Sequence, residues 1–338
     1  MKFRSKKLLV TGGAGFIGSN FISYILEKYN DLFIYNLDLL TYAGNLNNTN
    51  SFKSNRRYKF IHGNISDEKL LNKIFKKYEI DGVINFAAES HVDNSIKNPE
   101  IFIKTNINGV YNLLNSAYSY WFESPFKPKN KFNFARFHQI STDEVYGSIE
   151  KGSFNEHSKY SPNSPYSASK ASADMLVRSF NKTYGLDTAI SISSNNYGLN
   201  QNKEKFIPTV INSILKDKKI PIYGNGKNIR DWLCVLDNSE AICKIFNKGK
   251  SGCTYNVGSK NELTNIQLAN KIYNVMFEMN ITTKKFNHFI DYVEDRFGHD
   301  FRYSISTKKI KNELGWNPKN IFEKSIKNII NNIKEQQK

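Results

Sequence analysis

Two short stretches of the chain carry side chains that could act as acids and bases on one substrate. In Thr142-Asp143-Glu144, two adjacent carboxylates follow a hydroxyl at the end of an apolar run. Tyr166 and Lys170 are four residues apart, so on a helix they share one face. An unperturbed tyrosine has a pKa of ~10, and we expect the neighbouring ammonium group, helped by a cofactor cation, to lower that pKa. The pair could then take a hydroxyl proton while a hydride leaves the same carbon atom.

A glycine-rich turn near the start of the chain predicts a dinucleotide site. An apolar strand at 7–12 leads into GGAGFIG at 12–18, and a helical pattern follows. Glycines in this context let the backbone approach a pyrophosphate at the N-terminus of the helix. A second strand, at 32–37, ends in Asp38, where an acid can accept hydrogen bonds from a ribose. Because this acid would repel a 2′-phosphate, Asp38 favours NAD over NADP.

The elements that must position these residues alternate between strand and helix patterns. This rhythm predicts an α/β fold, a Rossmann-type doubly wound parallel sheet, in which ligands bind at the carboxyl ends of the strands. We expect a Rossmann domain at 1–196, a return of the chain to it around 231–257, and a smaller mixed α/β substrate domain at 197–338. The expected strands lie at 58–62, 82–87, 134–140, 188–193, 219–223, from 230 onward and at 252–258. The expected helices lie at 68–78, 108–120, 165–184, 206–215, 265–278, 306–314 and 320–338.

Charge and hydropathy narrow the choice of partners. The chain has 338 residues and a formal net charge of +17, from 48 basic and 31 acidic side chains. The basic residues are scattered and form no arm or tract, so we expect no nucleic-acid partner and a surface suited to an anionic small molecule. No apolar run approaches the ~20 residues of a membrane helix, so we expect no membrane span. The last helix is basic and amphipathic, and we expect it to dock on the core.

The cysteines and the start of the chain indicate a reducing compartment. Cys234, Cys243 and Cys253 fit neither a disulfide framework nor a C-x-x-C metal site, so we expect free thiols in the cytoplasm. No histidine spacing suggests a metal ligand set either, and we expect no metal. The basic start leads into a short apolar run that ends in glycines, which is too short for the apolar part of a signal peptide.

Eight segments of the sequence together resemble the extended short-chain dehydrogenases/reductases and, within them, the family of dTDP-glucose 4,6-dehydratases. The similarity extends over nearly the whole chain. The segments are TGGAGFIGS at 11–19, DLLTYAGN at 38–45, NFAAESHVD at 85–93, ISTDEVYG at 140–147, SPYSASKAS at 164–172, SSNNYG at 193–198, RDWL at 230–233 and DRFGHDFRY at 295–303.

This resemblance implies a reaction without net redox change. NAD oxidises the sugar 4-hydroxyl, water is eliminated across carbons 5 and 6, and hydride returns to carbon 6. The resemblance implies that Tyr166 is the base for the 4-hydroxyl, that Lys170 tunes it, and that Thr142 bonds the same oxygen. Glu144 would then remove the proton on carbon 5, and Asp143 would protonate the departing 6-hydroxyl.

The resemblance also implies residues that bind the two ligands. Arg230 and Arg296 suit a diphosphate, because guanidinium groups match phosphate oxygens, although a single arginine can equally form a surface ion pair. His91 and His299 could instead be ordinary hydrogen-bonded histidines. The residues implied for NAD are Gly12, Gly15, Phe16, Ile17, Gly18, Asp38, Thr41, Asn64, Ile65, Ala87, Ala88, Ser90, Thr105, Tyr166, Lys170 and Asn196. Those implied for the nucleotide sugar are His91, Thr142, Asn195, Glu204, Lys205, Tyr223, Arg230, Asn265, Arg296 and His299.

A few positions depart from the family pattern. Asn64 stands where an aspartate commonly contacts adenine, and Asn94 replaces an arginine. Leu199-Asn200 replaces a pair with proline, and Phe297 interrupts the usual DRPGHD. The last two changes lie toward the nucleotide, so they bear on the choice of base more than on the reaction.

Three other interpretations stay open at this point. The same chemistry could act on UDP-glucose, since thymine and uracil differ by one methyl group. An NAD-dependent 4-epimerase is disfavoured by the pair Asp143-Glu144, because elimination needs both an acid and a base. A non-catalytic NAD-sensing or nucleic-acid-binding scaffold is disfavoured by the intact acid–base set. The resemblance also implies a homodimer formed through helices of the Rossmann domain.

Overall fold

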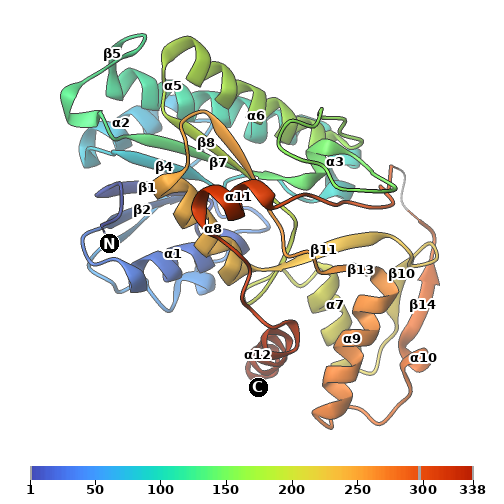
Figure 1. The fold of residues 1–338 in the computed structure, drawn as a ribbon. Helices are drawn as coiled ribbons and strands as arrows, with labels where there is room; N and C mark the ends of the chain where they lie inside the picture. Colours follow the sequence, from blue (N-terminus) through green and yellow to red (C-terminus); the bar gives the residue numbers. More distant parts are fainter. Residues whose placement is uncertain (1, 296–297, 337–338) are drawn as a thin grey trace.

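The computed structural model describes residues 2–295 and 298–336, and its centre is a seven-stranded sheet (Figure 1). The strand order is β12-β8-β7-β4-β1-β2-β3, and every neighbouring pair runs parallel. The strands are β1 (Lys7–Thr11), β2 (Phe33–Asp38), β3 (Tyr58–His62), β4 (Gly82–Asn85), β7 (Arg136–Thr142), β8 (Thr188–Ser193) and β12 (Cys253–Val257). The order reverses between β1 and β4, where doubly wound sheets bind ligands. The predicted fold class is confirmed.

Helices cover both faces of this sheet, because the buried side chains of its strands alternate between the two faces. Leu9 packs under one helical layer, whereas Leu8 and Val10 pack under the other. The first layer consists of α2 (Glu68–Tyr78), α5 (Gly109–Trp121) and α6 (Pro165–Tyr184). The second consists of α1 (Phe16–Lys28) and α8 (Val235–Lys248), which pack against each other (Figure 1).

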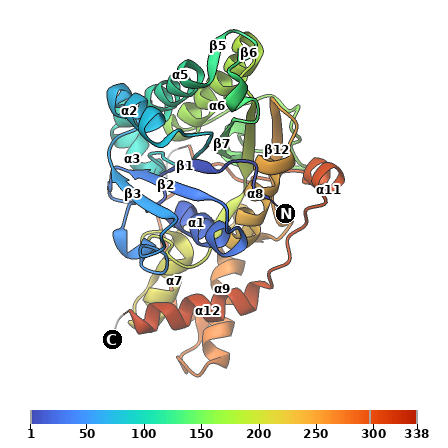
Figure 2. The same ribbon diagram turned by 90° about the vertical axis from the view of Figure 1, so that its left-hand side faces the viewer.

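A second core lies beside the sheet and is built mainly from the later part of the chain. The helices α7 (Phe206–Leu215), α9 (Asn265–Glu278) and α12 (Phe322–Glu335) enclose it. Figure 2 shows α12 crossing α9, and Ile326, Ile329 and Ile330 of α12 are buried there. The expected docking of the last helix is confirmed. The small strands are β9 (Asn195–Tyr197), β10 (Ile220–Tyr223), β11 (Ile229–Cys234), β13 (Glu262–Thr264) and β14 (Ile290–Val293).

Several predicted elements have the expected bounds, among them 58–62, 68–78, 165–184, 206–215 and 265–278. Other elements were not predicted, and α8 is the largest of them. The helix α11 (Lys308–Leu314) lies within the predicted helix at 306–314, and the remaining helices are α3 (Val92–Lys97), α4 (Pro99–Phe102), the π-helix Ile103–Asn108 and α10 (Phe286–Phe289). The 3-10 turns are Leu46–Thr49, Asn130–Phe132 and Asp143–Tyr146, and β5 (Phe122–Ser124) and β6 (Lys127–Pro128) form a short hairpin.

The structure also bears on the expectations about membrane-spanning helices and about the cysteines. Within the described residues, no helix is long and apolar enough to cross a membrane. Cys234, Cys243 and Cys253 are free thiols, and two of them are buried.

A buried histidine in β7 makes folding sensitive to acid. His138 is fully buried, and neither of its ring nitrogens has a hydrogen-bond partner among residues 2–295 and 298–336. Burial, helped by the charge of Arg136, lowers the pKa of His138 to about 3. An unfolded histidine titrates near ~6.5, so between these two pKa values the unfolded chain binds the extra proton. Stability should therefore fall by about 1.4 kcal/mol per pH unit as the pH drops below ~6.5.

His138→Leu tests this effect. Leucine has a similar volume and no proton to bind, so the variant should unfold at nearly the same urea concentration as wild type at pH ~7.5. At pH ~5 it should be the more stable of the two by about 2 kcal/mol. Urea unfolding at both pH values measures the difference, and an equal acid loss in both proteins would assign the acid sensitivity to other groups.

Candidate active site

A cavity of about 680 Å³ lies at the carboxyl ends of the central strands, a size typical of ligand sites. The glycine-rich turn, the ends of β4 and β7, the start of α6 and the segment around β9 all contribute to its wall. Every site residue named from the sequence lines this cavity, with the single exception of Arg296, which lies outside the described residues. The two stretches Thr142-Asp143-Glu144 and Tyr166–Lys170 are thus brought together.

The glycine-rich turn is held in place by the first two strands. Gly12, at φ +69°, donates its N–H to the Leu37 carbonyl oxygen over 2.9 Å. The Asp38 carboxylate accepts the N–H groups of Ala14, at 2.9 Å, and of Leu40, at 2.8 Å. Asp38 therefore shapes the turn as well as facing the cavity.

The start of α1 suits a phosphate group. Gly15 is the N-cap, provides no side-chain cap, and the first turn contains no acidic residue. The first N–H groups of the helix therefore remain open toward the cavity, where the helix dipole favours an anion. Gly18 packs against the turn so closely that a Cβ there would lie 2.4 Å from the Gly12 carbonyl oxygen. The residues present fit a dinucleotide whose diphosphate lies at this helix.

The local sequence places Tyr166 at the beginning of α6. Ser164 caps the helix, accepting the Ser167 N–H at 3.1 Å, and the Ser167 hydroxyl accepts the Ser164 N–H at 3.1 Å. Pro165 occupies the first turn, where its missing N–H costs nothing. Tyr166 and Lys170 follow on one face, and both are buried against the end of β7.

Asp143 is placed to act as an acid. It lies in the 3-10 turn that follows β7, it is buried, and its Oδ2 atom has no hydrogen-bond partner in the described part of the chain. Burial raises the pKa of Asp143 well above its usual value, and the charge of Glu144 raises it further, whereas Arg230 acts in the opposite direction. Burial therefore favours the protonated form of Asp143, which lies beside a second carboxyl group that is only half-buried.

The protein without its cofactor does not lower the pKa of Tyr166, so the expected decrease cannot come from the Lys170 ammonium alone. Burial raises the pKa of Tyr166, the charge of Glu144 adds to the increase, and a hydrogen bond with Thr142 opposes it. The Lys170 ammonium instead donates to the Ile140 carbonyl oxygen over 2.6 Å. Burial lowers the pKa of Lys170 to about 8. Tyr166 thus needs a further positive charge in the cavity before it can act as a base near neutral pH.

The residues expected to face the sugar nucleotide already have partners within the chain. The Arg230 guanidinium donates to the carbonyl oxygens of Ile229, Phe301 and Asp300 and lies 4.2 Å from the centre of the Tyr303 ring. Its position is therefore fixed at the cavity wall.

The two histidines at the wall are also hydrogen-bonded. His299 bonds Asp295 through Nδ1 at 2.6 Å. His91 accepts the Asn94 N–H at 3.4 Å through Nδ1, and its Nε2 lies 3.7 Å from Glu204. Both side chains still line the cavity.

Sequence reasoning singled out fewer residues than the cavity contains. Tyr42 and Glu89 line it, and both stand inside segments that carry the resemblance, so the segments themselves were the available signal. Phe206, Pro221 and Trp232 also line it, without any comparable pattern around the first two.

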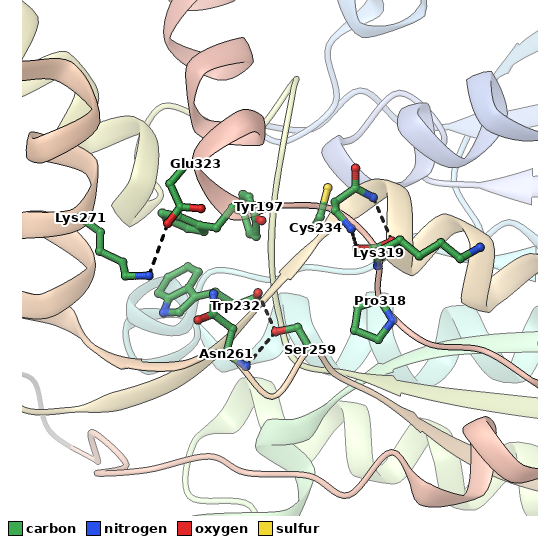
Figure 3. Close-up of a pocket in the computed structure, with 12 residues that line it drawn as sticks. Tyr197, Trp232, Cys234, Ser259, Asn261, Lys271, Pro318, Lys319 and Glu323 are labelled. Carbon is green, nitrogen blue, oxygen red and sulfur yellow. Dashed lines mark hydrogen bonds and ion pairs between the residues drawn. The ribbon is translucent and has the colours of Figure 1, made fainter. Parts of the chain in front are cut away.

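A second, smaller cavity of about 350 Å³ shares Trp232 with the first and lies next to the segment before α12 (Figure 3). Its charged groups are paired: Lys271 with Glu323 at 3.6 Å, and Lys319 with Glu240 at 3.2 Å. The Asp237 carboxylate, also in its wall, accepts the N–H group of Lys319 at 3.0 Å. These contacts hold α12 and the preceding segment in place.

Comparison with known proteins decides the family. A family model described as GDP-mannose 4,6 dehydratase matches residues 9–329. The chain belongs to this family. Within it, the chain is 45% identical over 334 residues to the dTDP-glucose 4,6-dehydratase of Salmonella typhimurium, an alignment covering 96% of this chain and 91% of the relative. It is equally similar to dTDP-glucose 4,6-dehydratase 1 of Escherichia coli K12, at 45% over 334 residues. The resemblance inferred from the sequence is confirmed.

Solved structures agree with this placement. DesIV, a dTDP-glucose 4,6-dehydratase from Streptomyces venezuelae crystallised with NAD, superposes with a TM-score of 0.89 at 37% identity, covering 98% of both chains. A UDP-glucose 4-epimerase from Thermotoga maritima has a TM-score of 0.86 at 26% identity, covering 98% of this chain and 100% of the epimerase. Dehydratases and epimerases therefore share this fold, and the side chains in the cavity must distinguish them.

Proposed function

We propose that the chain is a dTDP-glucose 4,6-dehydratase, which converts dTDP-glucose to dTDP-4-keto-6-deoxyglucose and water with NAD as its cofactor. The observation that carries the proposal is the pair Asp143-Glu144, placed beside Tyr166 in the cavity that also contains the glycine-rich turn. Burial favours the protonated form of Asp143, the form that an elimination requires and a simple epimerisation does not. Identity of 45% to dTDP-glucose 4,6-dehydratases over nearly the full length supports the choice of substrate.

The cofactor would lie along the glycine-rich turn. The open N–H groups at the start of α1 would bind its diphosphate, and Asp38 would accept hydrogen bonds from its adenosine ribose. Lys170 would contact the nicotinamide ribose. When bound, NAD accepts hydride from carbon 4 of the sugar, supplies positive charge near Tyr166, and later provides the hydride for carbon 6.

Within this arrangement, each acid–base side chain has one proton to move. The Tyr166 oxygen takes the proton of the 4-hydroxyl, and Thr142, hydrogen-bonded to Tyr166, orients that hydroxyl. The 4-keto group then acidifies carbon 5, whose proton passes to Glu144. Asp143 donates its proton to the departing 6-hydroxyl, which leaves as water. Arg230, fixed at the wall, is suited to face the sugar-nucleotide diphosphate.

Product analysis tests this proposal. The NAD-loaded protein is incubated separately with dTDP-glucose, UDP-glucose and GDP-mannose, and the nucleotide sugars are identified by mass spectrometry and NMR. We expect a 4-keto-6-deoxy product, formed fastest from dTDP-glucose. Faster turnover of UDP-glucose would move the assignment to that nucleotide, and the absence of any 4-keto-6-deoxy sugar would refute the dehydratase assignment.

Gly18→Ala should abolish high-affinity NAD binding. The added methyl group would meet two backbone positions, the Gly12 carbonyl oxygen at 2.4 Å and the Gly13 Cα at 2.8 Å, and neither can move without opening the turn. We expect the Kd for NAD, measured by calorimetry, to rise at least about tenfold, as expected for the loss of about 1.4 kcal/mol. Gly152→Ala is the control for a general loss of stability, because its methyl group meets no atom within 4 Å while its φ of +79° strains an alanine there. Equal Kd values in both variants would contradict the assigned role of the turn.

We propose a homodimer formed through α5 and α6. Support comes from large apolar side chains that remain exposed on these helices and on the neighbouring α4 and π-helix, namely Tyr111, Met175, Ile101 and Ile103.

The three unpaired cysteines support a reducing, cytoplasmic location.

A further inference from the structure

Three successive turns of α6 hold the end of β7, the strand that carries the acid–base residues. Tyr166, Lys170 and Asp174 are four residues apart and therefore lie on one face of the helix. The Lys170 ammonium donates to the Ile140 carbonyl oxygen over 2.6 Å, and the Ser141 hydroxyl donates to Asp174 Oδ2 over 2.6 Å. Together with the bond between Tyr166 and Thr142, these contacts tie residues 140–142 to the helix.

Asp174, which bonds Ser141 where α6 packs on the end of β7, is an unusual residue for such a buried position. It is completely buried, and its Oδ1 atom has no hydrogen-bond partner among residues 2–295 and 298–336. Its Oδ2 atom accepts a second bond, from the Tyr160 hydroxyl at 3.1 Å. A carboxylate this deep in the protein costs free energy unless other charges compensate it. Asn or Ser could satisfy the same two donors more cheaply, so the charge itself calls for an explanation.

The charged groups that face Asp174 are two cations on its own helix. Lys170 lies one turn before it and Arg178 one turn after it. From other elements it faces uncharged hydroxyl groups, those of Ser141 on β7 and of Tyr160 in the preceding loop. Arg178 directs its Nη2 to the Tyr160 hydroxyl at 2.9 Å and to Thr254 at 3.2 Å. Asp174 is thus the negative charge that acts on the buried end of Lys170.

We propose that Asp174 is a positioning residue for the dehydratase reaction: its carboxylate keeps the Lys170 ammonium charged and, through Ser141, fixes the strand end that bears Asp143 and Glu144. The inference rests on the function proposed above. In the proposed function Lys170 acts through its ammonium group, which donates to the Ile140 carbonyl oxygen and would donate to the cofactor ribose, and burial works against the charge of that group.

The direction of the effect follows from the charges. Burial lowers the pKa of Lys170 to about 8, and the charge of Asp174 acts against this decrease. Without that charge, Lys170 would lose its proton at a lower pH, and turnover would fall earlier on the alkaline side. Burial raises the pKa of Asp174 to about 6, so at pH ~7.5 the carboxylate is ionised. Below pH ~6 the carboxylate becomes protonated, and the negative charge that keeps Lys170 protonated is lost.

The test compares three variants of the NAD-loaded enzyme by the pH dependence of kcat/KM. Asp174→Asn keeps the shape and both accepted hydrogen bonds but removes the charge. We expect its alkaline limb about one pH unit below that of wild type, which is about a tenfold loss above both pKa values, with a change of less than about threefold near pH 7. Ser141→Ala removes the tether and leaves the charge, so it should lower kcat and leave the limb in place.

Tyr160→Phe provides an independent measurement if the asparagine variant folds poorly. It removes one donor from the Asp174 carboxylate, so the acid limb should move to higher pH. In protein labelled with ¹³C at the lysine Cε atoms, the titration of Lys170 reports the same shift without turnover. An unchanged Lys170 titration in Asp174→Asn, or a uniform loss of kcat and Tm at every pH, would overturn the inference. Wild-type protein that makes no 4-keto-6-deoxy sugar would instead refute the proposed function, while the Lys170 titration would still decide the inference.

Discussion

Tyr166→Phe is expected to lower kcat by about 10²–10⁴-fold, the range for losing a positioned general base. The phenyl ring keeps the packing of the native side chain, including the edge contact with Phe102 at 6.4 Å between ring centres. Only the hydroxyl group that we propose takes the 4-hydroxyl proton is lost. The fold and the affinity for dTDP-glucose should therefore change little. Steady-state kinetics and calorimetric titration with the substrate separate the two effects.

Tyr42→Phe is the matched control for this prediction. Tyr42 lines the same cavity, and its hydroxyl is 3.4 Å from Ser90 at the exposed rim. Removing that hydroxyl should change kcat by less than about tenfold, since a hydrogen bond to a neutral partner contributes about 1 kcal/mol. A Tyr166→Phe enzyme as active as the Tyr42→Phe enzyme would place the base elsewhere.

Glu144→Gln should separate oxidation from elimination. The amide cannot take the proton on carbon 5, while Tyr166 and Lys170 remain in place for the first step. We expect NADH absorbance to build up on the enzyme when dTDP-glucose is added, and product formation to fall by about 10²-fold or more. Stopped-flow absorbance measures the first quantity and product analysis the second.

Asp143→Asn distinguishes the two carboxyl groups. The proton on carbon 5 can still leave in this variant, because Glu144 is intact, but the 6-hydroxyl receives no proton. In deuterated water, recovered sugar should therefore carry deuterium at carbon 5 in Asp143→Asn and not in Glu144→Gln. Exchange in both variants, or a Glu144→Gln enzyme that makes no NADH at all, would contradict the assigned roles.

Most of the site could be predicted from the sequence because the motifs that mark it lie at the ends of strands. Glycine turns, the acid after the second strand and the carboxyl pair after β7 are all local patterns, and parallel strands bring their ends to one edge. All candidate residues within the described ranges consequently line a single cavity. The helix that carries Tyr166 and Lys170 was predicted at 165–184, and the structure shows Ser164 as its N-cap, Pro165 at its start and Gly185 as its C-cap.

What the sequence did not reveal depends on contacts between distant segments. The helix α8 lies in the return of the chain to the sheet, and its buried face is complementary to α1, which no local pattern specifies. The direction of the Tyr166 pKa shift depends on its burial and on Glu144, not on the lysine one turn away. No sequence pattern distinguishes Asp174, because an acid inside a helix usually faces solvent, and only the packing of α6 against β7 buries this one.

The most direct test of the central proposal follows one hydrogen atom through the reaction. dTDP-glucose deuterated at carbon 4 is converted by the NAD-loaded enzyme in ordinary water, and the position of the label in the product is read by NMR. The proposed reaction moves the label from carbon 4 to carbon 6 of a 4-keto-6-deoxy sugar. A label that stays on carbon 4, in a product that retains its 6-hydroxyl and has the inverted configuration, would contradict it.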